Sequence, residues 1–319
     1  TYDPTTFNRD YESLSTDDRL PLFNRATDGV YAPGSTFKLC TAVAALESGI
    51  ITPTTTIRDQ GVYTYYAYPQ PKCWIYRQYG STHGSINVSQ AITESCNYFF
   101  YETGRLTGIE TIDNYATQFG LGRSTGIETG DSKGALASPE YAKANELEWT
   151  DGQTITAAIG QSYNLFTPIQ LANYVATLVG DGEHYKAHLL KNVKSYDNSS
   201  MIYAYDEGPE NTVSISDSTL QAVKKGMYGV ANSTLSSQFS RCIVTCGAKT
   251  GSAQVGTDIA NGTFVCFAPY DDPQIAVAVV IEKGGSGAAL AGVAVDIVNA
   301  YFSREEIGTA IIGENTLIS

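Results

Sequence analysis

The stretch Tyr31-Ala-Pro-Gly-Ser-Thr-Phe-Lys-Leu-Cys40 decides how the rest of the chain is read. Pro33 and Gly34 end whatever structure precedes them. Apolar residues then recur at helical spacing, at Phe37, Leu39, Ala42, Val43, Ala45 and Leu46, and the pattern closes at Gly49. A helix that begins near Ser35 places Ser35 and Lys38 one turn apart on the same face.

Ser35 and Lys38 at this spacing form a candidate nucleophile and base. A serine hydroxyl is a weak nucleophile and needs a neighbour to take its proton. A lysine can do so only where burial or the positive end of a helix lowers its pKa. The helix N-terminal amides would also face an oxyanion over the serine. Because Ser-x-x-Lys arises by chance about once or twice in such a chain, this pair needs support from other motifs.

Composition narrows the class of protein. The chain has 319 residues, of which 42% are hydrophobic and 17% charged, as in a globular protein with a sizeable core. Its net charge of −13 argues against nucleic acid as a partner, since phosphate binding needs clustered Lys and Arg. The acidic residues are spread along the chain, which is typical of a solvated surface.

The beginning of the chain carries no signal-peptide pattern, and no run approaches about 18 apolar residues. The chain starts Thr-Tyr-Asp-Pro, without an initiator methionine. We therefore expect a processed or trimmed piece, so any membrane anchor would lie in an N-terminal segment missing from this sequence.

Six cysteines occur, and no two of them have the Cys-x-x-Cys spacing of zinc or redox sites: Cys40, Cys73, Cys96, Cys242, Cys246 and Cys266. Cys242 and Cys246 stand in a stretch that reads as a strand, where four residues span about 13 Å. A disulfide tolerates a Cα separation of only about 7 Å. We therefore expect mostly free, buried thiols. His83 has no histidine or acidic residue close by in the sequence, which favours a structural role.

Helical patterns fill the middle of the chain, at 86–93, 98–106, 111–119, 169–179 and, after a Ser216 cap, about 217–230. Residues 20–25 resemble a short strand or extended segment, and 120–150 resemble a loop. Residues 60–84 are rich in Tyr, Pro and Gly and predict a hairpin-like insertion or ordered loop near the site. Its aromatic residues could line a groove or pack the loop onto the body: Tyr63, Tyr65, Tyr66, Tyr68 and Trp74.

The last third changes to β-type periodicity, at 243–255, 263–268 and 274–282, with a turn at 269–273 and a final helix at 291–302. Residues 185–215 alternate weakly, as edge strands or loops do. This order predicts an α+β fold, with a central antiparallel sheet flanked by helices and a mainly helical subdomain. We expect one domain over 1–319, in which a helical subdomain of about 60–170 is inserted into a sheet-containing subdomain of 1–59 and 171–319.

Ser95-Cys96-Asn97 stands between two expected helices. Ser and Asn are favoured where helices begin, so a simple cap is one interpretation. The functional interpretation is a hydroxyl that relays a proton and an amide that binds a peptide carbonyl.

Lys249-Thr250-Gly251-Ser252 lies in a β-type run. Gly251 would permit close approach of a ligand or another backbone. A lysine beside two hydroxyls can bind a carboxylate, although on its own an exposed strand lysine is the better interpretation.

Together and in this order, the three motifs resemble the transpeptidase domain of penicillin-binding proteins, whose signatures include Ser-x-x-Lys and Lys-Thr-Gly. The separations agree with that family: 60 residues from Ser35 to Ser95 and 154 from Ser95 to Lys249. Further stretches resemble the class B, monofunctional type, with the elongation-type and sporulation-type enzymes of Gram-positive bacteria as the nearest likeness: 23–26, 31–38, 159–161 and 167–170.

Three features depart from the family pattern. Ser252 stands where Thr is usual, which keeps the hydroxyl, and Ser162 stands where Gly is usual, which could alter the loop behind the site. The pedestal domain expected ahead of the catalytic domain is absent from this sequence.

The resemblance implies a peptidoglycan D,D-transpeptidase. Ser35, deprotonated by Lys38, would attack the carbonyl between two D-alanines that end a stem peptide, and an amine of a neighbouring stem would then displace it. Backbone amides of Ser35 and Ser252 would form the oxyanion hole. Ser95 would pass the proton to the departing D-alanine, and Asn97 would bind the peptide carbonyl.

Lys249 would supply positive potential, Thr250 and Ser252 would hydrogen-bond the terminal carboxylate, and Gly251 would also belong to the substrate-binding residues. β-Lactams would acylate Ser35. No metal, nucleotide or other cofactor is called for.

The resemblance also implies a partner and a location. These are a membrane glycan polymerase and the extracellular face of the bacterial cytoplasmic membrane. Three alternatives stay open: a DD-carboxypeptidase, a β-lactamase and a non-enzymatic β-lactam sensor domain. A β-lactamase of class A would need a loop glutamate, which no stretch here matches.

Overall fold

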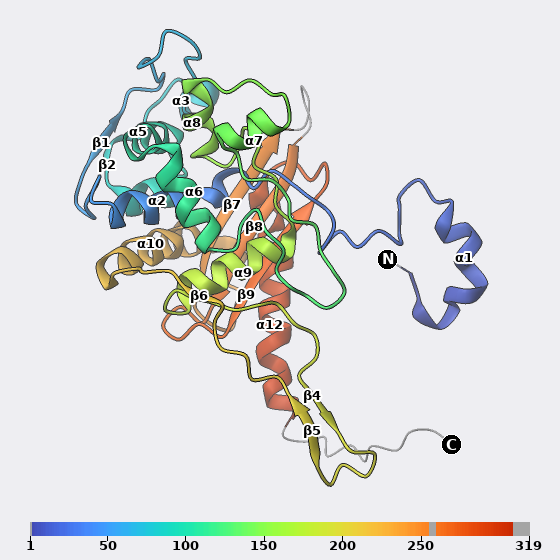
Figure 1. Cartoon of the computed structure of the whole chain (residues 1–319). Helices are drawn as coiled ribbons and strands as arrows, with labels where there is room; N and C mark the ends of the chain where they lie inside the picture. The colour runs from blue at the N-terminus through green and yellow to red at the C-terminus, as the bar shows by residue number, and fades with distance from the viewer. Residues whose placement is uncertain (1, 255–259, 309–319) are drawn as a thin grey trace.

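A three-stranded antiparallel sheet forms the centre of the computed structural model, which describes residues 2–254 and 260–308 (Figure 1). Its strands are β7 (Gly247–Gln254), β8 (Ala260–Ala268) and β9 (Ile275–Ile281), in the order β7-β8-β9. Helices cover the sheet, so the predicted α+β class is confirmed.

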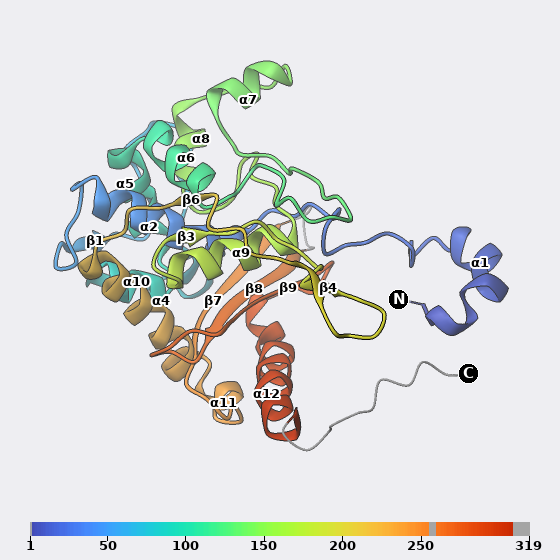
Figure 2. The same cartoon turned by 60° about the horizontal axis from the view of Figure 1, so that its bottom comes forward.

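The two faces of the sheet pack against different sets of helices, because successive side chains of a strand point to opposite faces. Phe264, Cys266 and Ala268 of β8 belong to one buried cluster with α12 (Ala291–Gly308). Val265 and Phe267 belong to a second cluster, with helices from the middle of the chain. Figure 2 shows α12 on one side of the sheet and α9 on the other.

The remaining helices are α1 (Phe7–Ser15), α2 (Lys38–Glu47), α3 (Trp74–Tyr79), α4 (Val88–Thr93), α5 (Asn97–Thr107), α6 (Ile109–Gln118), α7 (Pro139–Ala144), α8 (Asp151–Ala157), α9 (Pro168–Val179), α10 (Asp217–Gly229) and α11 (Ser236–Phe239). Short strands pair as β1 (Ile57–Asp59) with β2 (Gly84–Ile86), β3 (Glu183–His184) with β6 (Asn211–Thr212), and β4 (Asn192–Lys194) with β5 (Met201–Ala204). No helix in the described ranges is both long enough and apolar enough to span a bilayer.

Helix α2 lies in the buried core of the protein. A 3₁₀ turn over Gly34–Phe37 leads into it, and every residue from Lys38 to Leu46 is buried. Its apolar side chains pack against α5, α6 and α10, which explains the helical apolar pattern of the sequence. The helix that Ser216 was predicted to cap is α10, and the Ser216 hydroxyl accepts a hydrogen bond from the Thr219 amide.

Three glycines let the backbone around Ser35 pack tightly. The Gly34 amide donates to the Gly160 carbonyl at 2.9 Å. A Cβ on Gly160, whose φ is +75°, would lie 2.0 Å from the Gly34 carbonyl oxygen. A Cβ on Gly251 would lie 2.5 Å from the Pro33 carbonyl oxygen, so the predicted close approach of another backbone at Gly251 is confirmed.

Some sequence predictions of secondary structure are wrong. Residues 243–246 are not part of the strand, which begins at Gly247, and Val255, its expected end, lies outside the described residues. Residues 20–25 form turns, and the helices α1, α3 and α7 were not predicted. These helices have only six to nine residues, too few for an apolar period to show.

Gly160→Ala should destabilise the protein strongly, because the new methyl group meets the Gly34 backbone and φ stays positive. The left-handed conformation costs about 1–2 kcal/mol, and overpacking adds about 1–3 kcal/mol. Gly49→Ala is the matched control, since φ at Gly49 is +73° and no atom beyond its two neighbours in the chain lies within 4 Å of the added Cβ. Urea unfolding of both variants measures the difference. Equal losses would contradict the packing described here.

Candidate active site

Lys38 and Lys249 converge on Ser95. Lys38 Nζ donates to the Ser95 carbonyl at 2.8 Å and to Asn97 Oδ1 at 2.6 Å, and it lies 3.3 Å from Ser95 Oγ. Lys249 Nζ lies 3.0 Å from the same hydroxyl and donates to the Thr250 carbonyl at 3.1 Å. Residues from all three sequence motifs therefore meet at one hydroxyl.

Each side chain reaches this point because of its position in an element. Lys38 is the first residue of α2, and Asn97 is the first residue of α5. Lys249 stands opposite Val265 in the sheet, and cross-strand partners share a face, so Lys249 points toward the helices. Ser95 has φ +53°, a left-handed conformation that turns the chain sharply between α4 and α5.

Both lysine side chains are buried, with 0% of their surface exposed. Burial lowers the pKa of Lys38 to about 8. Burial also lowers the pKa of Lys249 well below its ordinary value, and the charge of Lys38 acts in the same direction. A lysine whose pKa is near 8 is neutral in about one molecule in ten at pH 7, and the neutral amine is the form that can accept a proton.

Ser35 lines a cleft of about 400 Å³ together with Ser95, Asn97, Thr250 and Ser252. The hydrogen bonds of the described residues include none between Ser35 Oγ and Lys38 Nζ, because that ammonium faces Ser95 and Asn97. Catalytic hydrogen bonds often form only when substrate binds. The cleft thus brings the predicted nucleophile together with polar side chains from the other two motifs.

The backbones of Ser35 and Ser252 are held close to one another. A Cβ on Gly34 would lie 2.9 Å from the Ser252 carbonyl oxygen and 3.1 Å from its amide nitrogen. The Ser252 hydroxyl accepts a hydrogen bond from the Gly287 amide at 3.1 Å and stays exposed in the cleft. The Ser35 and Ser252 backbones therefore lie at the same end of the cleft.

The aromatic residues of 60–84 include examples of both predicted roles, packing of the loop onto the body and lining of a groove. Tyr63 is buried and packs against Tyr98 and Tyr101. Trp74 lines the cleft, and its indole N–H donates to the Glu94 carbonyl at 3.0 Å. Tyr68 is exposed. Tyr63 therefore packs the loop onto the body of the protein, whereas Trp74 lines the cleft.

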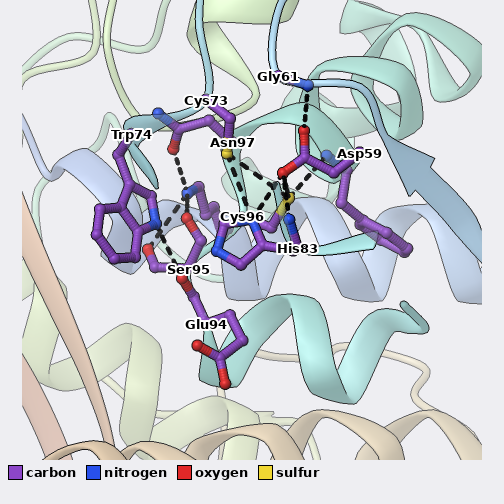
Figure 3. A network of polar contacts seen from close by, with 11 residues as sticks. Asp59, Gly61, Cys73, Trp74, His83, Glu94, Ser95, Cys96 and Asn97 are labelled. Atoms are coloured by element: carbon purple, nitrogen blue, oxygen red, sulfur yellow. Dashed lines mark hydrogen bonds and ion pairs between the residues drawn. The ribbon is translucent and has the colours of Figure 1, made fainter. Parts of the chain in front are cut away.

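A second polar cluster lies directly behind Ser95 (Figure 3). Asp59 Oδ2 lies 2.8 Å from His83 Nδ1, and Cys96 Sγ lies 3.7 Å from the same carboxylate oxygen. Cys73 Sγ lies 3.6 Å from His83 Nδ1 and 3.8 Å from Cys96 Sγ. The sequence prediction that His83 has no acidic partner is therefore wrong, because Asp59 comes from the neighbouring strand β1.

The donor atoms of Asp59, Cys73, His83 and Cys96 can hold a metal ion, since all four lie within 4.8 Å of one another. Thiolate, imidazole and carboxylate ligands in a closed set of four fit tetrahedral zinc, whose bonds of about 2.0–2.3 Å set the ligand atoms about 3.3–3.8 Å apart. A zinc ion bound there would fix the position of Cys96 and, through the backbone, the positions of the adjacent Ser95 and Asn97. Sequence reasoning missed this cluster because its members are spread over 38 residues without a recognisable spacing.

Protein prepared with zinc in the medium should contain about one equivalent of zinc, because the four donors form a closed tetrahedral set. Cys96→Ser and Cys73→Ser should lower that content and reduce thermal stability. Cys40→Ser is the control, since Cys40 is equally buried but lies outside the cluster. Elemental analysis after gel filtration provides the measurement. Zinc-free protein from zinc-replete medium would contradict the assignment.

Comparison with known proteins agrees with this geometry. The family described as the penicillin binding protein transpeptidase domain matches residues 1–302. The "Peptidoglycan D,D-transpeptidase MrdA" of Escherichia coli is 34% identical over 316 residues, which cover 91% of this chain and 49% of that protein. The chain thus spans about half the length of this relative.

Two solved structures are similar over most or all of the chain. Pseudomonas aeruginosa PBP2 in complex with WCK 5153 has a TM-score of 0.83 and 30% identity, covering 94% of this chain and 66% of the other. A structure titled "Structural coordination of polymerization and crosslinking by a peptidoglycan synthase complex" has a TM-score of 0.82 and 26% identity, covering 100% of this chain and 53% of the other. The narrower likeness to enzymes of Gram-positive bacteria stays a prediction. The chain belongs to the penicillin-binding protein transpeptidase family, in the class B group of the MrdA proteins.

Proposed function

We propose that the chain is the catalytic domain of a serine D,D-transpeptidase that cross-links peptidoglycan. The observation that carries the proposal is the convergence of Lys38 and Lys249 on Ser95, in the cleft that Ser35 lines. The family and its MrdA relatives support the same activity.

In the acylation step, Ser35 Oγ attacks the carbonyl carbon of the penultimate D-alanine while the neutral amine of Lys38 takes the hydroxyl proton. The Ser35 and Ser252 amides hold the oxyanion, and one such donor contributes about 3 kcal/mol in comparable enzymes. Collapse of the tetrahedral intermediate breaks the C–N bond. Lys38 returns the proton through Ser95, whose hydroxyl it already contacts, and D-alanine leaves as an amine.

In the deacylation step, an amine of a second stem peptide attacks the ester carbon and loses a proton to the same relay. The C–O bond breaks, Ser35 regains its proton and a peptide cross-link remains. Before acylation, Lys249, Thr250, Gly251 and Ser252 would bind the carboxylate of the terminal D-alanine, which departs with that residue, and Asn97 would bind a peptide carbonyl of the first stem. A β-lactam would acylate Ser35 by the first step and block the second.

We further propose that residues of about 60–170 form a helical subdomain inserted into the sheet-containing subdomain. The cleft combines Asn97 of α5 with Thr250 and Ser252 of β7, which fits a site between these two parts. In the whole protein, the domain would work on the outer face of the cytoplasmic membrane beside a glycan polymerase. The similar peptidoglycan synthase complex, whose title names polymerisation and crosslinking, supports that partnership.

Product analysis separates this function from its alternatives. A synthetic pentapeptide ending in D-Ala-D-Ala is incubated with the protein and a labelled amine acceptor. A transpeptidase should release D-alanine and join the label to the shortened peptide, whereas Ser35→Ala should do neither. Release without label at saturating acceptor would indicate a DD-carboxypeptidase. Rapid turnover of penicillin to its hydrolysed form would indicate a β-lactamase, and stable acylation without any peptide reaction would indicate a sensor.

The rate of penicillin acylation should rise with pH and level off above about 8, because the lowered pKa of Lys38 makes the neutral amine the main form only above that pH. Lys38→Met should reduce the rate by about 10²–10⁴-fold and remove this pH dependence, as expected for loss of a general base. Lys225→Met, at an exposed lysine, is the control and should leave the profile unchanged. Stopped-flow measurements from pH 6 to 9 test this. An unchanged rate and profile in Lys38→Met would exclude Lys38 as the base.

A further inference from the structure

Cys242 and Cys246 lie in contact and are not part of the cluster of Asp59, Cys73, His83 and Cys96. Their sulfur atoms are 3.4 Å apart, in the segment between α11 and β7. The sequence predicted that a strand would separate these residues by about 13 Å, and that prediction is wrong, because the chain turns before β7 begins at Gly247. The turn brings the two thiols face to face.

Two asparagine side chains hold the backbone of this turn in place. The Ile243 amide donates to Asn299 Oδ1 at 2.9 Å, and Asn299 Nδ2 donates to the Arg241 carbonyl at 3.0 Å. Asn232 Nδ2 donates to the Cys246 carbonyl at 3.2 Å. The turn is therefore fixed to α12 on one side and to the residues after α10 on the other, and the two sulfurs stay close without a bond between them.

Access distinguishes this pair from the other close cysteines of the described chain. The sulfur atoms of Cys73 and Cys96 are also close, at 3.8 Å, but both residues are 0% exposed. They belong to the cluster that also contains Asp59 and His83. Cys242 is partly exposed, while Cys246 is buried behind it. An oxidant can therefore reach Cys242 first, and Cys246 is placed to complete the reaction.

We propose that Cys242 and Cys246 form a disulfide bond, closing the turn ahead of β7, when the folded protein meets a disulfide oxidant such as glutathione disulfide. This inference goes beyond the transpeptidase function and does not depend on it. Both thiols are free in the present structure.

The reaction is a pair of thiol–disulfide exchanges. The Cys242 thiolate attacks one sulfur of glutathione disulfide, whose S–S bond breaks and releases one glutathione. The Cys246 thiolate then attacks Cys242 Sγ and releases the second glutathione. Two cysteine thiols are oxidised, one glutathione disulfide is reduced, and the two thiol protons pass to the two glutathiones. The hydrogen bond from Cys246 lowers the pKa of Cys242 to about 6, which favours the attacking thiolate.

The position of the turn connects the bond to the catalytic cleft. Cys246 precedes the first residue of β7, and Lys249 follows three residues later. On its other side, Asn232 lies between Val230 and Thr234, which both line the cleft. A disulfide here would hold the entry of the lysine-bearing strand without touching a proposed catalytic group.

Trypsin provides a direct test, since cleavage after Arg241 and Lys249 leaves both cysteines in one peptide, 242–249. Folded protein is treated with glutathione disulfide, denatured in acid, alkylated and digested, with and without prior reduction. We expect this peptide to carry no alkyl group after oxidation and two after reduction. Cys266→Ser should behave like the unaltered protein, and Cys242→Ser should show Cys246 alkylated throughout. Circular dichroism confirms that each variant is folded.

Three results would overturn the proposal. One is a peptide 242–249 that carries two alkyl groups after oxidation. The second is a glutathione adduct on Cys242 that does not resolve into the internal bond. The third is a cross-link between the peptides that contain Cys73 and Cys96 in place of the expected one.

Discussion

The whole site depends on two lysine ammonium groups that are buried beside one another. Removing a charge from water is costly unless hydrogen bonds compensate. Among the described residues, every hydrogen bond that Lys38 and Lys249 donate ends on a neutral oxygen, at Ser95, Asn97 or Thr250. A carboxylate partner would stabilise the charged form and raise the pKa of the lysine. Neutral acceptors instead hold the lysines in position while leaving their pKa values low enough for proton transfer.

The fold provides this arrangement by bringing three distant segments into contact. Lys38 begins the buried helix α2, and Lys249 stands on the sheet face that packs against the helices from the middle of the chain. Ser95 occupies a left-handed turn between α4 and α5. Gly160 and Gly251 allow the backbone around Ser35 to press against its neighbours. Glycine at these points is a steric requirement, since a Cβ would overlap a carbonyl oxygen. The cleft is therefore a consequence of tight backbone packing as well as of its polar side chains.

Much of the site could be predicted from sequence, because each catalytic motif carries local information. Ser35 and Lys38 follow a Pro-Gly break, and the apolar residues of α2 have a clear helical period. The spacing of Ser95 and Lys249 could not show that their side chains meet, yet the combination of motifs was specific enough to imply it. The Asp59–His83 pair could not be predicted, because β1 and β2 bring it together across 24 residues. The β-branched residues at 243–245 suggested a strand, but contacts with Asn299 and Asn232 turn the chain there.

Mass spectrometry of the penicillin adduct tests the central claim most directly. Folded protein is incubated with a penicillin for hours, its intact mass is followed, and a tryptic digest locates the adduct. The account predicts a lasting adduct on the peptide 26–38, at Ser35 rather than at Thr27 or Thr36. An adduct at another residue, or folded protein that never forms one, would contradict the assignment of Ser35 as the nucleophile of this site.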